Sequence, residues 1–380
     1  MNILFYIHDT IDPLHGGIHR VTDVLVRRFS KDHQVFCLMA NKTRIDKLNN
    51  HYYLPNSTDI MARENVSFTR KLISDLSIDI IINQDGITPS SSSFILSVER
   101  GNAKMITVIH STPTLMYGIG KLPNSFQKNL PKEIQNFLGK AISYYFRMKY
   151  GNYWNSVVEK SDRIVMLSKS LETNLSEFMC KDFPSNKIIS IPNPVTLEAE
   201  GTPHKERMVL YVGRLSREKN IKSLLKIWER VHASNPLWRL EIIGDGDERA
   251  KLEKYAESNN IRNVKFRGQQ NPQYWYERAS VFCLTSTFEG LPLVLLEAMT
   301  FGDVPIAFDS FLTAKDVIDD GRNGFLVNAY DESHFANILQ EILDNEQMRN
   351  VMSNNARKKA SEFSLEKIVN NWYSLFSEYV

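Results

Sequence analysis

The sequence predicts an α/β protein made of two doubly wound domains that face each other across a cleft. Short, continuous apolar runs alternate with segments of helical periodicity, which is typical of a parallel sheet covered by helices. This alternation stops at a proline-rich stretch and then restarts, and 380 residues exceed one typical domain core. We therefore place the domains at residues 1–192 and 207–363, joined by a linker at residues 193–206.

The composition excludes several classes of protein. A formal net charge of +2 is too small for the concentrated basic face that nucleic-acid binding needs. The three cysteines, Cys37, Cys180 and Cys283, lie too far apart for a disulfide framework or a zinc site. The first residues lack the features of a signal peptide, and nowhere do roughly 18 apolar residues run together. We expect a cytoplasmic protein.

In the first domain, polar and glycine residues follow two of the predicted strands. All the predicted strands of this domain are residues 3–7, 34–39, 78–83, 105–110 and 163–167. Gly16 and Gly17 precede a predicted helix at residues 19–29, where they either bring backbone close to a ligand or only form a tight turn. His110 ends a strand at the sheet edge where α/β proteins bind ligands, although a structural hydrogen-bonding role is the alternative.

A basic segment interrupts this pattern at residues 115–155. Between residues 121 and 150 one acid, Glu133, stands against six basic residues: Lys121, Lys128, Lys132, Lys140, Arg147 and Lys149. After Pro131 the apolar residues, Tyr145 among them, fall on one helical face. Residues 121–150 therefore either contact an anionic membrane surface or a lipid-linked acceptor, or form a core-facing helix with a solvated basic side.

The second domain repeats the strand and helix alternation. Its predicted strands are residues 208–212, 240–243, 264–268, 281–284, 303–308 and 325–327, and its helices include residues 221–233, 247–258 and 272–280. The turn Gly244-Asp245-Gly246 matches half of a dinucleotide fingerprint, but Arg249 occupies the place of the third glycine. The sequence therefore does not support NAD binding.

The most informative stretch follows the strand at residues 281–284. Glu289 lies in a strand-to-helix loop, Pro292 fits the first helical turn, and Glu297 lies further along the helix. The helix start beside Gly290 and Leu291 offers N–H groups to a phosphate, so we interpret the stretch as a sugar-nucleotide site. The alternative is an acid that complements the helix dipole and a solvated helical glutamate.

Two cations five positions apart, Arg214 and Lys219, follow the strand at residues 208–212 and could reach one anionic centre, or could be plain surface charge. With the other motifs they complete an ordered set. The set comprises Gly213-Arg214 with Lys219, Ile243-Gly244-Asp245-Gly246, Phe266-Arg267-Gly268, Glu289-Gly290-Leu291-Pro292 with Glu297, and Asp320-Gly321-Arg322-Asn323-Gly324. Through this set of motifs the chain resembles the family 4 glycosyltransferases, and the resemblance covers nearly its whole length. These enzymes are retaining, use nucleotide sugars and have the GT-B fold of two Rossmann-like domains.

The resemblance implies roles for these residues. Arg214 and Lys219 would neutralise the departing diphosphate, Glu289 would accept hydrogen bonds from the donor sugar, and Glu297 would hold the ribose hydroxyls. His110 would orient a hydroxyl or assist the acceptor.

The other expected donor contacts come mainly from the backbone: Gly16, Gly17, Gly268, Gln270, Gly290, Leu291 and Leu293. The resemblance also implies that the first domain binds the acceptor, that the second binds the donor, and that the last helix, residues 364–380, returns to the first domain.

The expected function is retaining transfer of a hexose or N-acetylhexosamine from a nucleotide sugar, a UDP-sugar by preference, to a growing cell-surface glycan such as lipopolysaccharide or capsule. The acceptor is either free or lipid-linked, which would place a cytoplasmic enzyme at the inner face of the membrane. No metal or other cofactor is expected. The alternatives are a GDP-mannose-dependent transferase, a nucleotide-sugar epimerase with the same two-domain architecture, and a non-catalytic subunit that binds sugar nucleotides.

Overall fold

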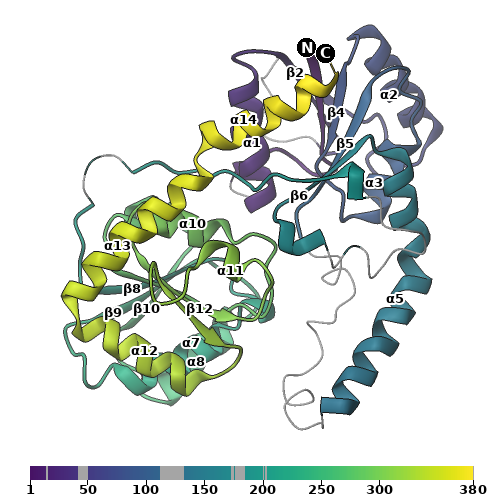
Figure 1. Cartoon of the computed structure of the whole chain (residues 1–380). Helices are drawn as coiled ribbons and strands as arrows, with labels where there is room; N and C mark the ends of the chain where they lie inside the picture. Colours follow the sequence, from purple (N-terminus) through teal and green to yellow (C-terminus); the bar gives the residue numbers. More distant parts are fainter. Residues whose placement is uncertain are drawn as a thin grey trace. The chain divides into compact units, whose positions relative to one another are not determined.

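The computed structural model describes residues 1–13, 16–41, 50–111, 132–172, 175, 185–199, 201 and 203–379, without the side chains of 132–140, 142 and 143. The predicted basic residues Lys121 and Lys128 lie outside this description. The chain forms two compact units (Figure 1). Unit 1 comprises Met1–Asn193 and Glu366–Val380, and unit 2 comprises Pro194–Leu365.

Within the described residues, unit 1 contains a seven-stranded parallel sheet in the order β3-β2-β1-β4-β5-β6-β7. Its strands are β1 (Asn2–Tyr6), β2 (Gln34–Met39), β3 (His51–Tyr53), β4 (Ile80–Asn83), β5 (Lys104–Ile109), β6 (Arg163–Met166) and β7 (Ile188–Ser190). In the central strand β1, every residue after Asn2 is buried, which explains its continuous apolar run.

The helices of unit 1 include one from the far end of the chain. Among the described residues these α-helices are α1 (Gly17–Phe29), α2 (Arg63–Asp75), α3 (Pro89–Ser97), α5 (Lys132–Lys160) and α14 (Leu365–Phe376). Figure 1 shows α14 beside α1, where the buried ring of Phe29 lies 6.2 Å from Trp372 and 5.4 Å from Phe376 between ring centroids. Arg28 and Glu366 add an ion pair of 2.9 Å. The end of the chain therefore completes the core of unit 1.

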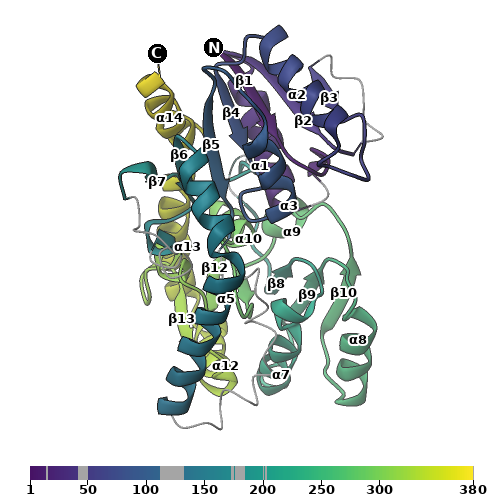
Figure 2. The same cartoon turned by 90° about the vertical axis from the view of Figure 1, so that its right-hand side faces the viewer.

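Helix α5 packs on unit 1 through its last turns. Trp154 and Val157 are fully buried there, and the Tyr153 hydroxyl donates to the Gly86 carbonyl at 2.8 Å. Its earlier turns extend beyond the sheet of unit 1 (Figure 2). Tyr145 is 57% exposed, which contradicts, at this residue, the alternative of a core-facing helix. Within the described part of the chain, no helix is long and apolar enough to cross a membrane.

Unit 2 contains, in the described residues, a six-stranded parallel sheet in the order β10-β9-β8-β11-β12-β13. Its strands are β8 (Met208–Val212), β9 (Arg239–Ile243), β10 (Val264–Gly268), β11 (Val281–Leu284), β12 (Val304–Asp309) and β13 (Phe325–Asn328). Its helices are α7 (Ile221–Val231), α8 (Arg249–Ser258), α9 (Gln273–Tyr276), α10 (Leu293–Thr300), α11 (Ala314–Val317), α12 (Glu332–Asp344) and α13 (Glu346–Ala360). Both sheets confirm the predicted α/β class.

The residues predicted as a linker are held against unit 2. The Val195 N–H donates to the carbonyl of Phe363 at 2.8 Å, and the Glu206 N–H donates to that of Arg278 at 2.7 Å. Val195 is also buried. The described residues of this segment therefore run along unit 2 as a packed strap, and the chain passes from unit 1 to unit 2 between Asn193 and Pro194.

Candidate functional site

Two loops at the carboxyl edge of the unit 2 sheet are tied together. They follow β8 and β11, which are neighbouring strands. The Thr287 N–H donates to the Glu218 carbonyl at 2.7 Å, and the Thr285 hydroxyl donates to the Lys219 carbonyl at 3.2 Å. Because the carboxyl ends of parallel strands meet at one sheet edge, motifs 70 positions apart become neighbours.

Lys219 and Glu289 meet in this place. The Lys219 ammonium donates to Glu289 Oε1 at 2.6 Å, and the Ser286 hydroxyl donates to the same oxygen at 2.7 Å. Their side chains are only 22% and 12% exposed, so this ion pair is partly shielded from water. Arg214 is exposed, and within the described part of the chain its guanidinium makes no hydrogen bond or ion pair. The structure thus brings Lys219 and Glu289 together and leaves Arg214 available to an anion.

The helix that follows Glu289 starts one residue later than predicted. Pro292 is the N-cap residue, and α10 begins at Leu293. No side chain caps this helix, so its first N–H groups are not satisfied by a side-chain acceptor. The Thr313 hydroxyl donates to the Gly290 carbonyl and fixes the loop. Leu291 and Leu293 are buried, so any contact of these two residues with a ligand would come from their backbone.

Glu297 is completely buried, which contradicts the alternative of a solvated helical glutamate. Its Oε1 accepts a hydrogen bond from the Thr196 hydroxyl at 2.5 Å, and its Oε2 accepts one from the Tyr276 hydroxyl at 3.2 Å. Neither partner is predicted from the sequence. Thr196 is 101 positions away and Tyr276 is 21 positions away, and no local pattern links either one to Glu297.

The predicted base-binding residues lie at the end of β10. Gly268 has a φ of 71°, in the left-handed region that favours glycine, and its carbonyl accepts the Gly244 N–H at 2.8 Å. The Gln270 amide is engaged at both ends: its Oε1 accepts from the Trp275 indole at 2.9 Å, and its Nε2 donates to the Arg267 carbonyl at 3.2 Å. The side chain of Gln270 therefore holds the loop in shape.

In unit 1 the predicted residues flank the carboxyl edge of the other sheet. Gly16, with a φ of 142°, precedes α1, and Gly17 is the first residue of that helix. His110 follows β5, is 6% exposed and places Nε2 2.5 Å from Gln84 Oε1, an acceptor, so Nε2 donates. Burial, with a smaller effect of His19, lowers the pKa of His110 to about 3, which keeps the imidazole neutral.

The surroundings of His110 are polar and include residues that the sequence analysis missed. Asp85 accepts hydrogen bonds at 2.5 Å from both the His8 N–H and the Ser91 hydroxyl, and burial raises its pKa. Within the described residues, several buried polar atoms here have no hydrogen-bond partner: His8 Nδ1, Thr10 Oγ1, Gln84 Nε2, His110 Nδ1 and Ser111 Oγ. Buried polar groups are normally satisfied, so this unit 1 polar cluster suits a ligand rich in hydroxyls.

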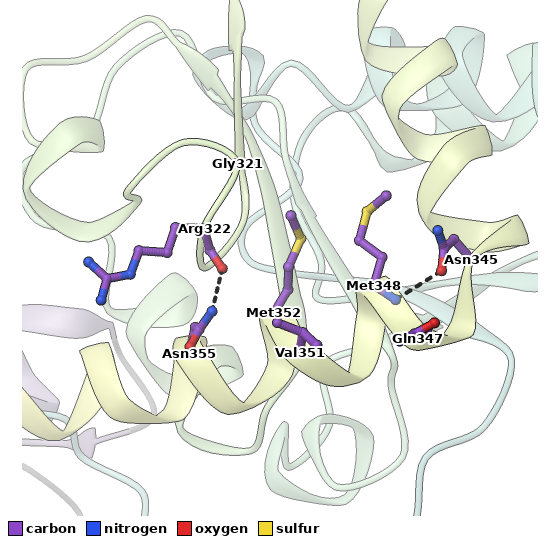
Figure 3. A pocket seen from close by; sticks show the side chains of 8 residues that line it. All are labelled: Gly321, Arg322, Asn345, Gln347, Met348, Val351, Met352 and Asn355. Atoms are coloured by element: carbon purple, nitrogen blue, oxygen red, sulfur yellow. Dashed lines mark hydrogen bonds between the residues drawn. The ribbon is translucent and has the colours of Figure 1, made fainter.

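A separate cavity of about 470 Å³ lies in unit 2 between α13 and the turn before β13 (Figure 3). One of its edges is closed by the Asn355 amide, which donates to the Arg322 carbonyl at 2.9 Å. The described lining contains one cation, Arg322, and none of the predicted site residues; the other lining residues are Gly321, Asn345, Gln347, Met348, Val351 and Met352. This cavity is therefore separate from the site that the chemistry indicates.

Comparison with known proteins identifies the type of enzyme. Residues 194–359 match the family model described as Glycosyl transferases group 1. An uncharacterized glycosyltransferase of Haemophilus influenzae is 28% identical over 94% of this chain and 95% of its own length. The chain is a glycosyltransferase. The predicted resemblance to this class of enzyme is thereby confirmed.

Two further comparisons bear on the glycosyltransferase. The GalNAc-α-(1→4)-GalNAc-α-(1→3)-diNAcBac-PP-undecaprenol α-1,4-N-acetyl-D-galactosaminyltransferase of Campylobacter jejuni is 36% identical, but over only 46% of this chain and 49% of its own length. The Anabaena protein HepE, in complex with UDP-glucose, superposes with a TM-score of 0.74 at 16% identity and covers 100% of both chains. That likeness confirms the predicted GT-B fold.

Proposed function

We propose that this glycosyltransferase moves a hexose or N-acetylhexosamine from a UDP-sugar to a growing cell-surface glycan, with retention of the anomeric configuration. The observation that carries the proposal is the Lys219–Glu289 pair beside the uncapped start of α10. A cation and helix N–H groups suit a diphosphate, and a carboxylate beside them suits sugar hydroxyls. The preference for uridine draws on the UDP-glucose complex of HepE, and the glycan acceptor on the Campylobacter relative.

In the proposed reaction, the bond between the anomeric carbon and the diphosphate oxygen breaks, and an acceptor hydroxyl oxygen forms the new bond on the same face. The hydroxyl proton leaves with the nucleoside diphosphate. Lys219 and Arg214 stabilise the negative charge that builds on the leaving group, while Glu289 holds the sugar ring. Glu297 holds the ribose. These cations supply the charge neutralisation that a metal ion would otherwise provide, so we propose transfer without a metal or other cofactor.

We assign the acceptor to unit 1. The unit 1 polar cluster offers buried hydrogen-bonding atoms at the carboxyl edge of its sheet, next to His110. Its neutral imidazole can exchange a hydrogen bond with a hydroxyl without introducing a charge. Gly16 and Gly17, which we keep as donor contacts, lie at a helix start without a side-chain cap on the same edge.

We also propose that α5 brings the enzyme to the inner face of the cell membrane. Tyr144 and Met148 are each 67% exposed, and Arg147 and Lys149 are exposed on the same turns. From residue 134 to residue 158 the helix carries no acid. Aromatic and basic side chains together favour an anionic lipid surface, which would present a lipid-linked acceptor.

The membrane assignment is tested by vesicle sedimentation with the variant Arg147→Ser/Lys149→Ser. Each cation contributes about 1 kcal/mol near an anionic bilayer, so we expect binding to anionic vesicles to weaken roughly tenfold to thirtyfold. The variant Lys251→Ser/Lys315→Ser removes the same charge from side chains that are 75% and 70% exposed, and serves as the control. Equal binding by both variants would contradict a specific role of α5.

Donor and mechanism are tested with the purified protein and a panel of UDP-, GDP- and ADP-sugars. We expect release of UDP and a product with the anomeric configuration of the donor. Preferential GDP release would replace the uridine assignment, and an inverted product would exclude retention. Free epimerised sugar without nucleotide release, or no turnover with any donor, would exclude transfer. The variant Glu297→Ala should weaken UDP binding, and unchanged affinity would refute its ribose role.

A further inference from the structure

The carboxylate of Glu297 is held by two neutral hydroxyl groups from different elements. Thr196 donates to one oxygen at 2.5 Å and Tyr276 donates to the other at 3.2 Å. Glu297 is fully buried, and a buried carboxylate is costly unless hydrogen bonds satisfy it. Both hydroxyls therefore help to orient the carboxylate.

The two donors are themselves fixed in different ways. The ring of Tyr276 is fully buried and stacks on Phe301, with ring centroids 5.8 Å apart and an interplanar angle of 19°. Thr196 is the third residue of unit 2, and the Val195 N–H beside it donates to the Phe363 carbonyl. Thr196 therefore belongs to the strap by which the chain enters unit 2, and not to helix α10, which carries Glu297.

We propose that Thr196 is a positioning residue for the donor nucleotide and acts through Glu297. Its hydroxyl sets the orientation in which Glu297 accepts the ribose hydroxyls, so the strap at residues 194–206 contributes to nucleotide affinity without touching the nucleotide. This inference rests on the proposed function, because it takes Glu297 to be the ribose acceptor. It adds a residue that does not belong to the ordered set of motifs named in the sequence analysis.

The test compares Thr196→Val, which keeps the shape and removes the hydroxyl, with Thr196→Ser, which keeps the hydroxyl. Affinities of the full-length protein for UDP and for 2′,3′-dideoxyuridine diphosphate are measured by calorimetry. We expect Thr196→Val to bind UDP roughly five- to tenfold more weakly, which is less than the full effect of losing a hydrogen bond to a charged group, because Tyr276 still binds the other oxygen of Glu297. Thr196→Ser should stay within about twofold of the wild type, and the dideoxy ligand should bind all three proteins alike.

The dideoxy ligand separates positioning from a general structural role. If Thr196→Val weakens both ligands equally, or weakens neither, the inference is wrong while the proposed function stands. If the wild type binds no UDP at all, the proposed donor fails and the inference falls with it. Should Thr196→Val not fold, Tyr276→Phe removes the second hydroxyl and must give the same selective loss for UDP, smaller because its bond is longer.

Discussion

Replacing Lys219 by methionine removes the ammonium group and keeps most of the apolar stem. The pair with Glu289 is short, at 2.6 Å, and largely shielded, so the cation interacts strongly with any nearby charge. A hydrogen bond to a charged group contributes about 1.5–3 kcal/mol, which corresponds to roughly 10- to 150-fold in kcat/KM. Because charge on the diphosphate grows toward the transition state, we expect most of this loss in kcat. Nucleotide release measured at a series of donor concentrations gives both constants.

The matched control is Lys315→Met in the same unit. Lys315 also forms an ion pair, 2.9 Å from Asp309, but its side chain is 70% exposed. Exposed pairs contribute about 0–1 kcal/mol, so this change should alter kcat/KM less than about fivefold. If Lys219→Met retains kcat/KM within about threefold of the wild type, or loses no more than the control, Lys219 does not stabilise the leaving group.

Three further predictions concern other parts of the molecule. Trp275→Phe removes the indole N–H that holds Gln270, and UDP affinity in calorimetry should fall about fivefold, as expected for one hydrogen bond of about 1 kcal/mol. Trp372→Ala opens the aromatic cluster around Phe29 and should cost about 3–5 kcal/mol of unfolding free energy in urea titrations. The pKa of His110 is about 3 when folded against an ordinary 6.5, so the unfolded chain binds the extra proton. Stability should therefore fall as pH decreases from 6.5 toward 3, by up to about 1.4 kcal/mol per pH unit, and His110→Asn should lack that part of the pH dependence in urea titrations.

The sequence predicts the interior strands because their burial on both faces requires uninterrupted apolar residues, as in β1 and β11. It does not predict β3 at His51–Tyr53 or β7 at Ile188–Ser190. Both are three residues long and only partly buried, and they lie at the two edges of the unit 1 sheet. A segment that short carries no readable period, and pairing with an existing sheet decides its conformation.

In the site, too, the contacts that follow from strand order could be predicted, and the contacts made only by tertiary packing could not. Lys219 and Glu289 follow two strands whose alignment in the sheet is predictable, and the structure places their charged groups in contact. The partners of Glu297 could not be predicted, because Thr196 and Tyr276 reach it through tertiary packing alone. The unit 1 polar cluster was missed apart from His110, since Gln84 and Asp85 stand among ordinary loop residues in the sequence.

The return of α14 to unit 1 has a consequence for biosynthesis. Because unit 2 is inserted between Asn193 and Glu366, the ribosome completes it before the last helix emerges. Until then the aromatic surface around Phe29 lacks its cover, so the unit that is translated first is the last to mature. An amino-terminal fragment ending at Asn193 should accordingly expose an aggregation-prone apolar patch around Phe29 and depend on chaperones. Pro194–Leu365, in contrast, is one uninterrupted stretch of chain that can fold before the last helix is made.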